Sequence, residues 1–294
     1  MKLSNRSFRR AIDGGVPLMR TKRDGSRCSR VAEMRNTTES AFPVPAVKNP
    51  AGLRRWVIEG LKSAYRGYDC ATHLESSWSM NTCFAGDAVI LEMLQTGKFI
   101  PYVMHSWLSF YSTMLDKNLE DQRRVLGIIE QHYRHWQMTT GDSVALVERV
   151  YRDIRCEEGV NRFVMVTKLA WLMRCEDVVI YDRLVGLALD RLIDEKLIDF
   201  CYWVPADPKS RGDEQRVKEI IDGYRQVDLA VRAIARVAEK ELDDYLTSAP
   251  NLPPALRNNR LRLVDKLLWG VGSDIDAKDR EGRRKQRALR RAQA

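Results

Sequence analysis

The 294-residue chain lacks the features that mark several common classes of protein. It has no uncharged apolar run of about 18 residues or more, so we expect no membrane-spanning helix and no membrane partner. Its N-terminal residues contain no apolar block like that of a secretory signal, which indicates an intracellular, cytoplasmic protein. The six cysteines are scattered without a C-x-x-C pair, which disfavours a zinc ribbon or a disulfide framework. Phosphate-binding glycine loops and the G-x-S-x-G motif are also absent.

Positive charge is concentrated at the two ends of the chain. The net charge is +9, with eleven Lys/Arg against four Asp/Glu in residues 1–50 and eight against four in residues 273–294. Basic ends fit contacts with the phosphates of nucleic acid, although they are also compatible with plain solubility. We therefore divide the chain into a basic, largely irregular arm (1–50), a helical domain (51–272) and a basic tail (273–294).

Apolar residues recur at helical spacing through most of the middle of the chain. Strict alternation of apolar and polar residues is almost absent, and the run V-V-I-Y (178–181) is too short to found a sheet. The pattern predicts an all-α bundle of about nine helices between flexible basic ends. Besides a segment around residue 168, the expected helices cover about 50–66, 84–95, 101–116, 118–136, 143–158, 182–198, 213–246 and 256–270.

One stretch, Arg162 to Asp190, places two charged residues in apolar surroundings. Lys168 lies at the entry to an apolar segment, and Asp182 occupies the position expected for a helix N-cap. An amine that loses its hydration is favoured in its neutral form, which is the form that attacks carbon centres. The same residues could instead form a structural ion pair and a helix cap, or the lysine could extend to solvent.

The pattern T-K-L-A-W-L-M-R-C…V-V-I-Y-D-R-L-V-G-L-A-L resembles the core of the helix-hairpin-helix DNA glycosylase superfamily, particularly its 8-oxoguanine glycosylase-like branch. The later run L-V-D-K-L-L-W-G (263–270) is similar to a D-x-x-L-W-x-x-G segment of that branch. The resemblance implies a multi-helix orthogonal bundle that binds duplex DNA and excises a damaged or modified base, in repair or in defence against foreign DNA. It implies Lys168 as the nucleophile that forms a Schiff base with the sugar, and Asp182 as the carboxylate that stabilises the cationic sugar.

The chain also departs from the family pattern. It has R-F-V-M-V where the family has a glycine-rich hairpin that donates N–H groups to a DNA phosphate, and the spacing from Lys168 to Asp182 is several residues shorter.

A flipped base needs an aromatic pocket, although each candidate aromatic could equally pack in the core. The candidates are Trp171, Tyr181, Tyr202, Trp203 and Trp269. The expected nucleic-acid contacts are Arg162, Arg183, Arg283, Arg284, Lys285 and Arg287.

Two alternatives remain at this point. One is a non-catalytic DNA- or protein-binding module on the same fold. The other is a HEPN-like ribonuclease, indicated by Arg66 and His73, although the intervening loop-like residues disfavour a shared helical face. His132 and His135 have a spacing that permits a shared metal, but no Cys or third His lies near them in the sequence. We therefore expect no metal and no cofactor.

Overall fold

The computed structural model describes residues 45–67, 87–110, 119–158, 163–200, 214–248 and 259–292. Backbone contacts divide the chain into two units, Met1–Phe42 and Pro43–Ala294, and every described residue belongs to the second. The described residues form ten α-helices and two strands of two residues each. This confirms the all-α prediction for that part of the chain. None of its helices is long and apolar enough to cross a membrane.

The helices follow one another with short connections wherever the connections are described. They are α3 (Pro50–Gly67), α5 (Asp87–Gln95), α6 (Pro101–Phe110), α7 (Leu119–Gln137), α8 (Ser143–Glu158), α9 (Phe163–Met173), α10 (Arg183–Asp194), α11 (Glu214–Val237), α12 (Glu239–Ser248) and α14 (Arg260–Ala292). Strands β1 (Ala46–Val47) and β2 (Ile198–Asp199) pair antiparallel.

Short polar side chains begin several of these helices by accepting otherwise unpaired backbone N–H groups. Asn49 Oδ1 accepts the N–H of Gly52 at 2.8 Å, immediately before Pro50 opens α3. Asp142 Oδ1 accepts the N–H of Ala145 at 2.8 Å at the start of α8. These caps confirm the helix starts predicted from Asn49-Pro50 and Asp142-Ser143.

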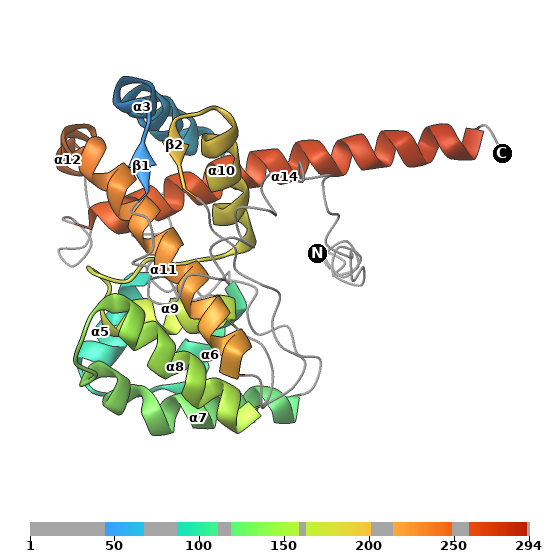
Figure 1. The fold of residues 1–294 in the computed structure, drawn as a ribbon. Coiled ribbons are helices and arrows are strands. Elements are labelled where there is room, and N and C mark those ends of the chain that lie inside the picture. Colours follow the sequence, from blue (N-terminus) through green and yellow to red (C-terminus); the bar gives the residue numbers. More distant parts are fainter. Residues whose placement is uncertain are drawn as a thin grey trace. The chain divides into compact units, whose positions relative to one another are not determined.

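The helices pack as two groups that share α11 (Figure 1). Helices α5 to α9 contact one another on one side, while α3, α10, α12 and α14 contact one another on the other. Helix α11 contacts both α8 and α14, and one continuous cluster of buried apolar residues fills the interior. Helix α9, which carries Lys168, and helix α10, which follows Asp182, therefore belong to different groups.

The long helix predicted for 213–246 is interrupted at Ala238, so that prediction is wrong in its length. Helix α11 ends at Val237, whose carbonyl oxygen accepts a hydrogen bond from Arg54 Nε at 2.9 Å. A carbonyl held by a side chain from α3 is diverted from the next turn of the helix. Helix α10 also ends earlier than predicted, because Lys196 adopts a left-handed backbone (φ 57°) before β2 begins.

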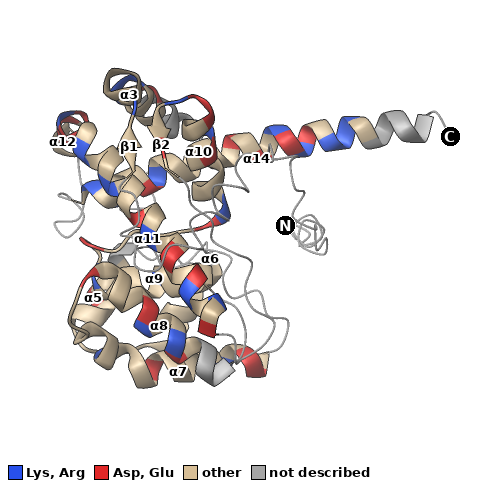
Figure 2. Cartoon of the chain, viewed as in Figure 1, with Lys and Arg blue, Asp and Glu red and all other residues tan. Residues whose placement is uncertain are grey.

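The glycine pattern predicted that the last helix ends at Gly270, and this prediction is wrong. Helix α14 continues through Gly270 and Gly272 to Ala292, so the basic residues between 273 and 292 are helical. A Cβ at Gly272 would lie 2.0 Å from the carbonyl oxygen of Leu184 in α10. This glycine therefore permits two helices to cross closely, and it does not terminate a helix. Figure 2 shows charged residues along the exposed part of α14.

Candidate functional site

Lys168 lies in the middle of α9, a helix whose other residues are almost all apolar and buried. The residue is only 4% exposed, so its side chain does not extend into bulk solvent. A buried lysine is costly unless nearby groups compensate its charge or keep it neutral. The charge of Lys168 therefore depends on the groups that surround its side chain.

Asp182 is the N-cap of α10, as its sequence position predicted. Its backbone is extended (φ −144°, ψ 178°), and Oδ1 accepts the N–H groups of Leu184 at 2.8 Å and Val185 at 3.0 Å. These two bonds fix the direction of the carboxylate. The cap explains the presence of an aspartate here, and both cap bonds are made by Oδ1 rather than by Oδ2.

Thr167 ties the two candidate residues together. Its buried hydroxyl accepts the N–H of Tyr181 at 3.2 Å and lies 3.2 Å from the Tyr181 carbonyl oxygen. Thr167 immediately precedes Lys168, and Tyr181 immediately precedes Asp182. One side chain therefore holds the backbone beside the lysine against the backbone beside the aspartate, across the junction between the two groups of helices.

The segment that leads from α9 to Asp182 is anchored on α11 and on the start of α14. Tyr224 donates from its hydroxyl to the Val179 carbonyl at 2.7 Å, and Asn259 Nδ2 donates to the Cys175 carbonyl at 2.5 Å. Burial raises the pKa of Tyr224 well above its ordinary value, so the hydroxyl remains a donor. With its backbone groups paired in this way, the segment gives Asp182 a defined position.

Asp265, on α14, is the residue that connects Lys168 and Asp182 electrostatically. It is 5% exposed, and burial raises the pKa of its carboxyl to about 6. The positive charges of Arg262, Lys266 and, more weakly, Lys168 oppose this rise. The negative charge of Asp182 adds to it. Lys168 and Asp182 are therefore both close enough to act on one buried carboxyl group.

We call Lys168, Asp182, Arg262, Asp265 and Lys266 the buried charge cluster. Four of its members are buried and the fifth, Asp182, is half-buried. Sequence reasoning named only Lys168 and Asp182. The run L-V-D-K-L-L-W-G drew attention for a different reason, although an Asp-Lys pair inside an apolar helical run is itself a signal of buried charge.

Trp171 packs against this cluster from one turn further along α9. Arg262 Cζ lies 4.4 Å from the centre of the Trp171 ring, and Trp107 stacks on Trp171 with a centroid distance of 6.4 Å. Arg262 also donates from Nη1 to Asp265 Oδ2 at 2.6 Å. Trp171 is only 1% exposed, so its ring is part of the core in this structure. Its indole N–H is buried and has no hydrogen-bond partner in the described part of the chain.

The other predicted aromatic residues are placed less centrally. Tyr181 is half-buried, with its ring 6.2 Å from that of Phe163, and Trp269 is half-buried on α14. Tyr202 and Trp203 lie outside the described residues. The structure thus brings Trp171 to the charge cluster and Tyr181 next to Asp182.

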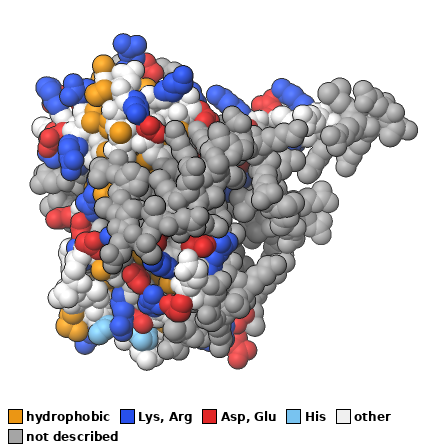
Figure 3. Space-filling model, in the orientation of Figure 1, with side chains coloured by type: hydrophobic (Ala, Val, Ile, Leu, Met, Phe, Trp, Pro, Cys, Tyr) orange, Lys and Arg blue, Asp and Glu red, His pale blue; other side chains and the backbone are white. Residues whose placement is uncertain are grey.

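Of the predicted nucleic-acid contacts, those on α14 lie at or near the surface. Arg284 and Lys285 are exposed, and Arg283 is half-buried. The side chain of Arg287 and all of Arg162 lie outside the part of the chain that the structure describes. Arg183 is exposed at the start of α10, but it is also bonded to Asp276 on α14. Figure 3 shows basic and acidic side chains together on the part of α14 that precedes the undescribed atoms.

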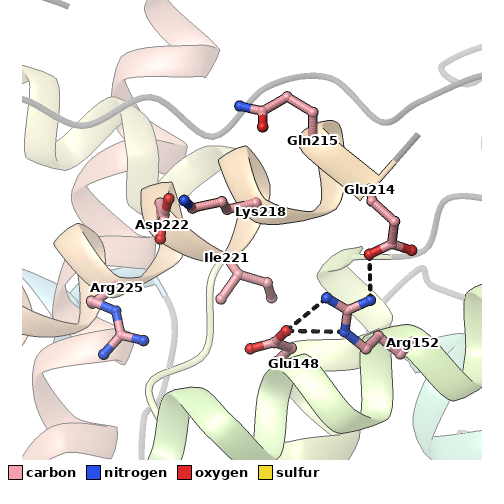
Figure 4. A pocket seen from close by; sticks show the side chains of 8 residues that line it. All are labelled: Glu148, Arg152, Glu214, Gln215, Lys218, Ile221, Asp222 and Arg225. Atoms are coloured by element: carbon pink, nitrogen blue, oxygen red, sulfur yellow. Dashed lines mark hydrogen bonds and ion pairs between the residues drawn. The ribbon is translucent and has the colours of Figure 1, made fainter. Parts of the chain in front are cut away.

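A separate cavity of about 450 Å³ lies between α8 and α11 (Figure 4). Arg152 bridges two carboxylates there, donating to Glu214 at 2.6 Å and to Glu148 at 3.0 Å. Burial raises the pKa of the nearby Asp222 carboxyl against the opposing charges of Lys218 and Arg225. Acidic and basic lining residues balance, so the cavity does not favour an anion. Neither Lys168 nor Asp182 lines it.

The sequence suggested two alternative sites, a histidine pair that could share a metal and an Arg–His pair of the ribonuclease type. His132 Nδ1 lies 3.9 Å from Asp153 and its ring stacks on Trp136, while His135 is exposed. Among the described residues, no group of three or more His, Cys, Asp or Glu side chains is placed to hold a metal ion. The side chain of Arg66 and all of His73 lie outside the described residues, so the ribonuclease alternative rests on the sequence alone.

The buried charge cluster thus unites two lysines, an arginine and two carboxylates from α9, the N-cap of α10 and α14, with Trp171 packed against it. Such an arrangement can hold a nucleophilic amine beside a fixed negative charge. No protein-family model, no curated protein and no solved structure matches this chain.

Proposed function

We propose that this chain is a DNA-binding protein that excises a damaged or modified base, with Lys168 as the nucleophile and Asp182 as the stabilising carboxylate. The observation that carries the proposal is the position of Lys168. It is buried beside Thr167, whose hydroxyl holds the residue preceding Asp182, and both charged residues act on Asp265. The resemblance of T-K-L-A-W-L-M and V-V-I-Y-D to helix-hairpin-helix glycosylases supports the same two roles.

The proposed chemistry gives a definite role to three members of the cluster, Lys168, Asp182 and Asp265. The neutral Lys168 amine attacks the sugar C1′ as the bond from C1′ to the base breaks and the base leaves with the electron pair. The Asp182 carboxylate offsets the positive charge that develops on the sugar. The attacking nitrogen then loses a proton, and Asp265, with a pKa of about 6, is a carboxylate suited to accept it near neutral pH. The C1′–O4′ bond then breaks, its electron pair goes to O4′, which takes up a proton, and the nitrogen lone pair completes the Schiff base.

The arrangement of the helices supports a glycosylase-like fold as part of this proposal. Helices α8 and α9 pack together and are joined by four undescribed residues, 159–162, which is the order of elements expected for a helix-hairpin-helix. A base pocket at the junction of the two groups of helices would be lined by Trp171 and Tyr181. In this structure Trp171 is covered, so base entry requires that Arg262 or Trp107 move away from its ring.

Borohydride trapping on duplex DNA tests the proposal directly, because reduction converts a Schiff base into a permanent protein–DNA bond. We expect an adduct on at least one duplex from a panel of oxidised, alkylated and deaminated bases. Lys168→Gln and the charge-preserving Lys168→Arg both lose the adduct. Lys266→Gln, which removes another buried lysine of the same cluster, retains it.

Three results would contradict the proposal in different ways. An adduct that survives in Lys168→Arg but disappears in Lys266→Gln would transfer the nucleophile to Lys266. Duplex binding with neither trapping nor base release across the panel would favour a non-catalytic DNA-binding module on this fold. Absence of duplex binding in the folded wild-type protein would refute both functions.

A further inference from the structure

One carboxylate on α14 contacts two exposed arginines, one on α10 and one on α14 itself. Asp276 accepts Arg183 Nη2 on Oδ1 at 2.5 Å and contacts Arg280 Nη2 through Oδ2 at 2.6 Å. Burial opposes ionisation of Asp276, but the hydrogen bonds and charges of the two arginines lower the pKa of its carboxyl below the ordinary value. The carboxylate is therefore ionised at neutral pH, and it uses a different oxygen for each arginine.

The crossing of α10 and α14 fixes this arrangement in space. Gly272 lies against the backbone of Leu184, so close that a Cβ would be 2.0 Å from the Leu184 carbonyl oxygen. Arg183 is the neighbour of Leu184 on α10, and Asp276 follows Gly272 by one helical turn on α14. The two helices are therefore positioned by backbone contact immediately beside the Arg183–Asp276 bond.

The charge and exposure of these groups fit a phosphate. Two guanidinium groups and one carboxylate leave a net charge of about +1 at this point of the surface. The side chains of Arg183 and Arg280 are 59% and 56% exposed, whereas that of Asp276 is 8% exposed. Each guanidinium has five N–H donors in a planar fork, and each contacts Asp276 through Nη2. The remaining donors are suited to the oxygens of one anion between them.

We propose that Arg183 and Arg280, aligned by Asp276, form a clamp for a backbone phosphate of duplex DNA. Asp276 acts as a positioning residue: it does not touch the phosphate but holds both guanidinium groups in the geometry that binds it. Further along the sequence of α14, Arg284, Arg287 and Arg291 follow Arg280 at intervals of four, three and four residues, so their backbone positions share one side of the helix. The clamp is thus the inner end of a basic stripe that can follow a DNA strand.

Duplex DNA is favoured over other anionic partners because the stripe is long. Between 277 and 292, α14 carries eight Lys/Arg and two Asp/Glu, and adjacent members of the stripe are spaced by about 4.5–6 Å along the helix axis. A single small anion would occupy only the clamp. The inference rests on the proposed DNA binding and adds to it, because a phosphate held by Arg183 lies next to Asp182, the carboxylate proposed to stabilise the sugar.

Charge-matched variants of the full-length protein test the clamp by duplex affinity and its salt dependence. We expect Arg183→Gln and Arg280→Gln each to weaken binding of an undamaged duplex on the order of fivefold. Each should also make the negative slope of log K against log salt shallower by about 1. Arg191→Gln is the control, since Arg191 lies near the opposite end of α10 and pairs with Glu195. This control removes the same charge from the same helix and leaves affinity and slope close to wild type.

Asp276→Asn gives the most informative result, because two explanations predict opposite signs. If Asp276 only neutralises the arginines, its removal makes the protein more basic and tightens DNA binding. If it positions them, Asp276→Asn weakens binding despite the added positive charge, and adding Arg183→Gln in that background costs less than it does alone. A circular-dichroism melt shows whether each variant is folded. If Asp276→Asn is unfolded, the double variant Arg183→Gln/Arg280→Gln tests the clamp instead. A loss of binding free energy in the double variant equal to the sum of the two single losses overturns the clamp.

The failure of the clamp can be distinguished from failure of the proposed function. A wild-type protein that binds duplex DNA but loses no more affinity in Arg183→Gln and Arg280→Gln than in Arg191→Gln refutes the clamp alone. Tighter binding by folded Asp276→Asn refutes the positioning role. A folded wild-type protein that does not bind duplex DNA refutes the clamp together with the proposed function.

Discussion

The hydroxyl oxygen of Thr167 lies 3.2 Å from both the backbone nitrogen and the carbonyl oxygen of Tyr181. Each of these residues precedes one member of the proposed catalytic pair, so the hydroxyl fixes the separation of Lys168 and Asp182 without contacting substrate. Threonine suits the position because its hydroxyl can donate and accept at once, while its methyl group packs in the core. The Thr-Lys pair in the sequence is therefore explained by a structural tie next to a buried charge.

Replacing Thr167 with Val removes the hydroxyl and keeps the shape of the side chain. The N–H of Tyr181 then loses its bond to this hydroxyl in a partly buried position, so we expect the free energy of unfolding to fall by about 1–3 kcal/mol. Thr167→Ser, which keeps the hydroxyl and loses one methyl group, should cost about 1 kcal/mol or less. Urea unfolding of both variants measures the difference; equal losses would mean that the tie contributes nothing to stability.

Two substitutions at Asp182 separate its capping role from its charge. Asp182→Asn keeps an oxygen that can accept from Leu184 and Val185, so we expect stability within about 0.5 kcal/mol of wild type. Asp182→Ala removes the cap and should cost about 1 kcal/mol. If the carboxylate stabilises a cationic sugar, both variants lose base excision, on the order of 100-fold or more. Single-turnover base release, measured beside urea unfolding, tests this; full activity in Asp182→Asn would leave Asp182 as a cap only.

The features that could be predicted from the sequence are those encoded by neighbouring residues. Asp142 and Asp182 are caps because a short carboxylate reaches N–H groups two or three residues ahead, whatever the rest of the fold does. Helical periodicity likewise predicted the buried faces of the helices, because it depends only on residues close in the sequence. The break at Ala238 depends on Arg54, which is distant in the sequence, so local pattern could not predict it.

The composition of the candidate site was only partly predictable, because it depends on how α14 packs against α9 and α10. Lys168 and Asp182 were named from a local pattern, and the structure places both near Asp265. The roles of Asp265 and Asp276 required knowledge of which helices cross. In the same way, the sequence predicted a helix end at Gly270, whereas α14 continues through Gly272, whose role depends on the backbone of Leu184 on another helix.

Asp265 should make stability depend on pH. Its carboxyl has a pKa of about 6 in the folded protein against an ordinary value of 3.8, because burial disfavours the charged form. Between these values the folded state binds more protons than the unfolded state, so the free energy of unfolding falls as pH rises from about 4 to about 6. The full loss, reached above the folded pKa, is on the order of 3 kcal/mol.

The Asp265→Asn variant isolates this dependence. We expect the difference in free energy of unfolding, wild type minus Asp265→Asn, to decrease between about pH 4 and pH 6.5 and then to level off. Asp279→Asn, at an exposed position on the same helix, is the control for the loss of one carboxylate. Denaturant titrations at several pH values measure both differences, and a difference for Asp265→Asn that does not vary with pH would contradict the burial of an ionisable carboxyl.

The two neighbouring glycines of α14 should respond in opposite directions to the same substitution. At Gly272 an alanine Cβ would lie 2.0 Å from the Leu184 carbonyl oxygen, so α10 and α14 must separate, and we expect a loss of about 2–4 kcal/mol. At Gly270 no described atom lies within 4 Å of an added Cβ, and alanine should stabilise the helix by about 0.5–1 kcal/mol. Thermal and urea unfolding of Gly272→Ala and Gly270→Ala provide the comparison. If the helix instead ended at Gly270, alanine there would bring no gain, and Gly272→Ala would be close to neutral because no helix crossing would depend on it.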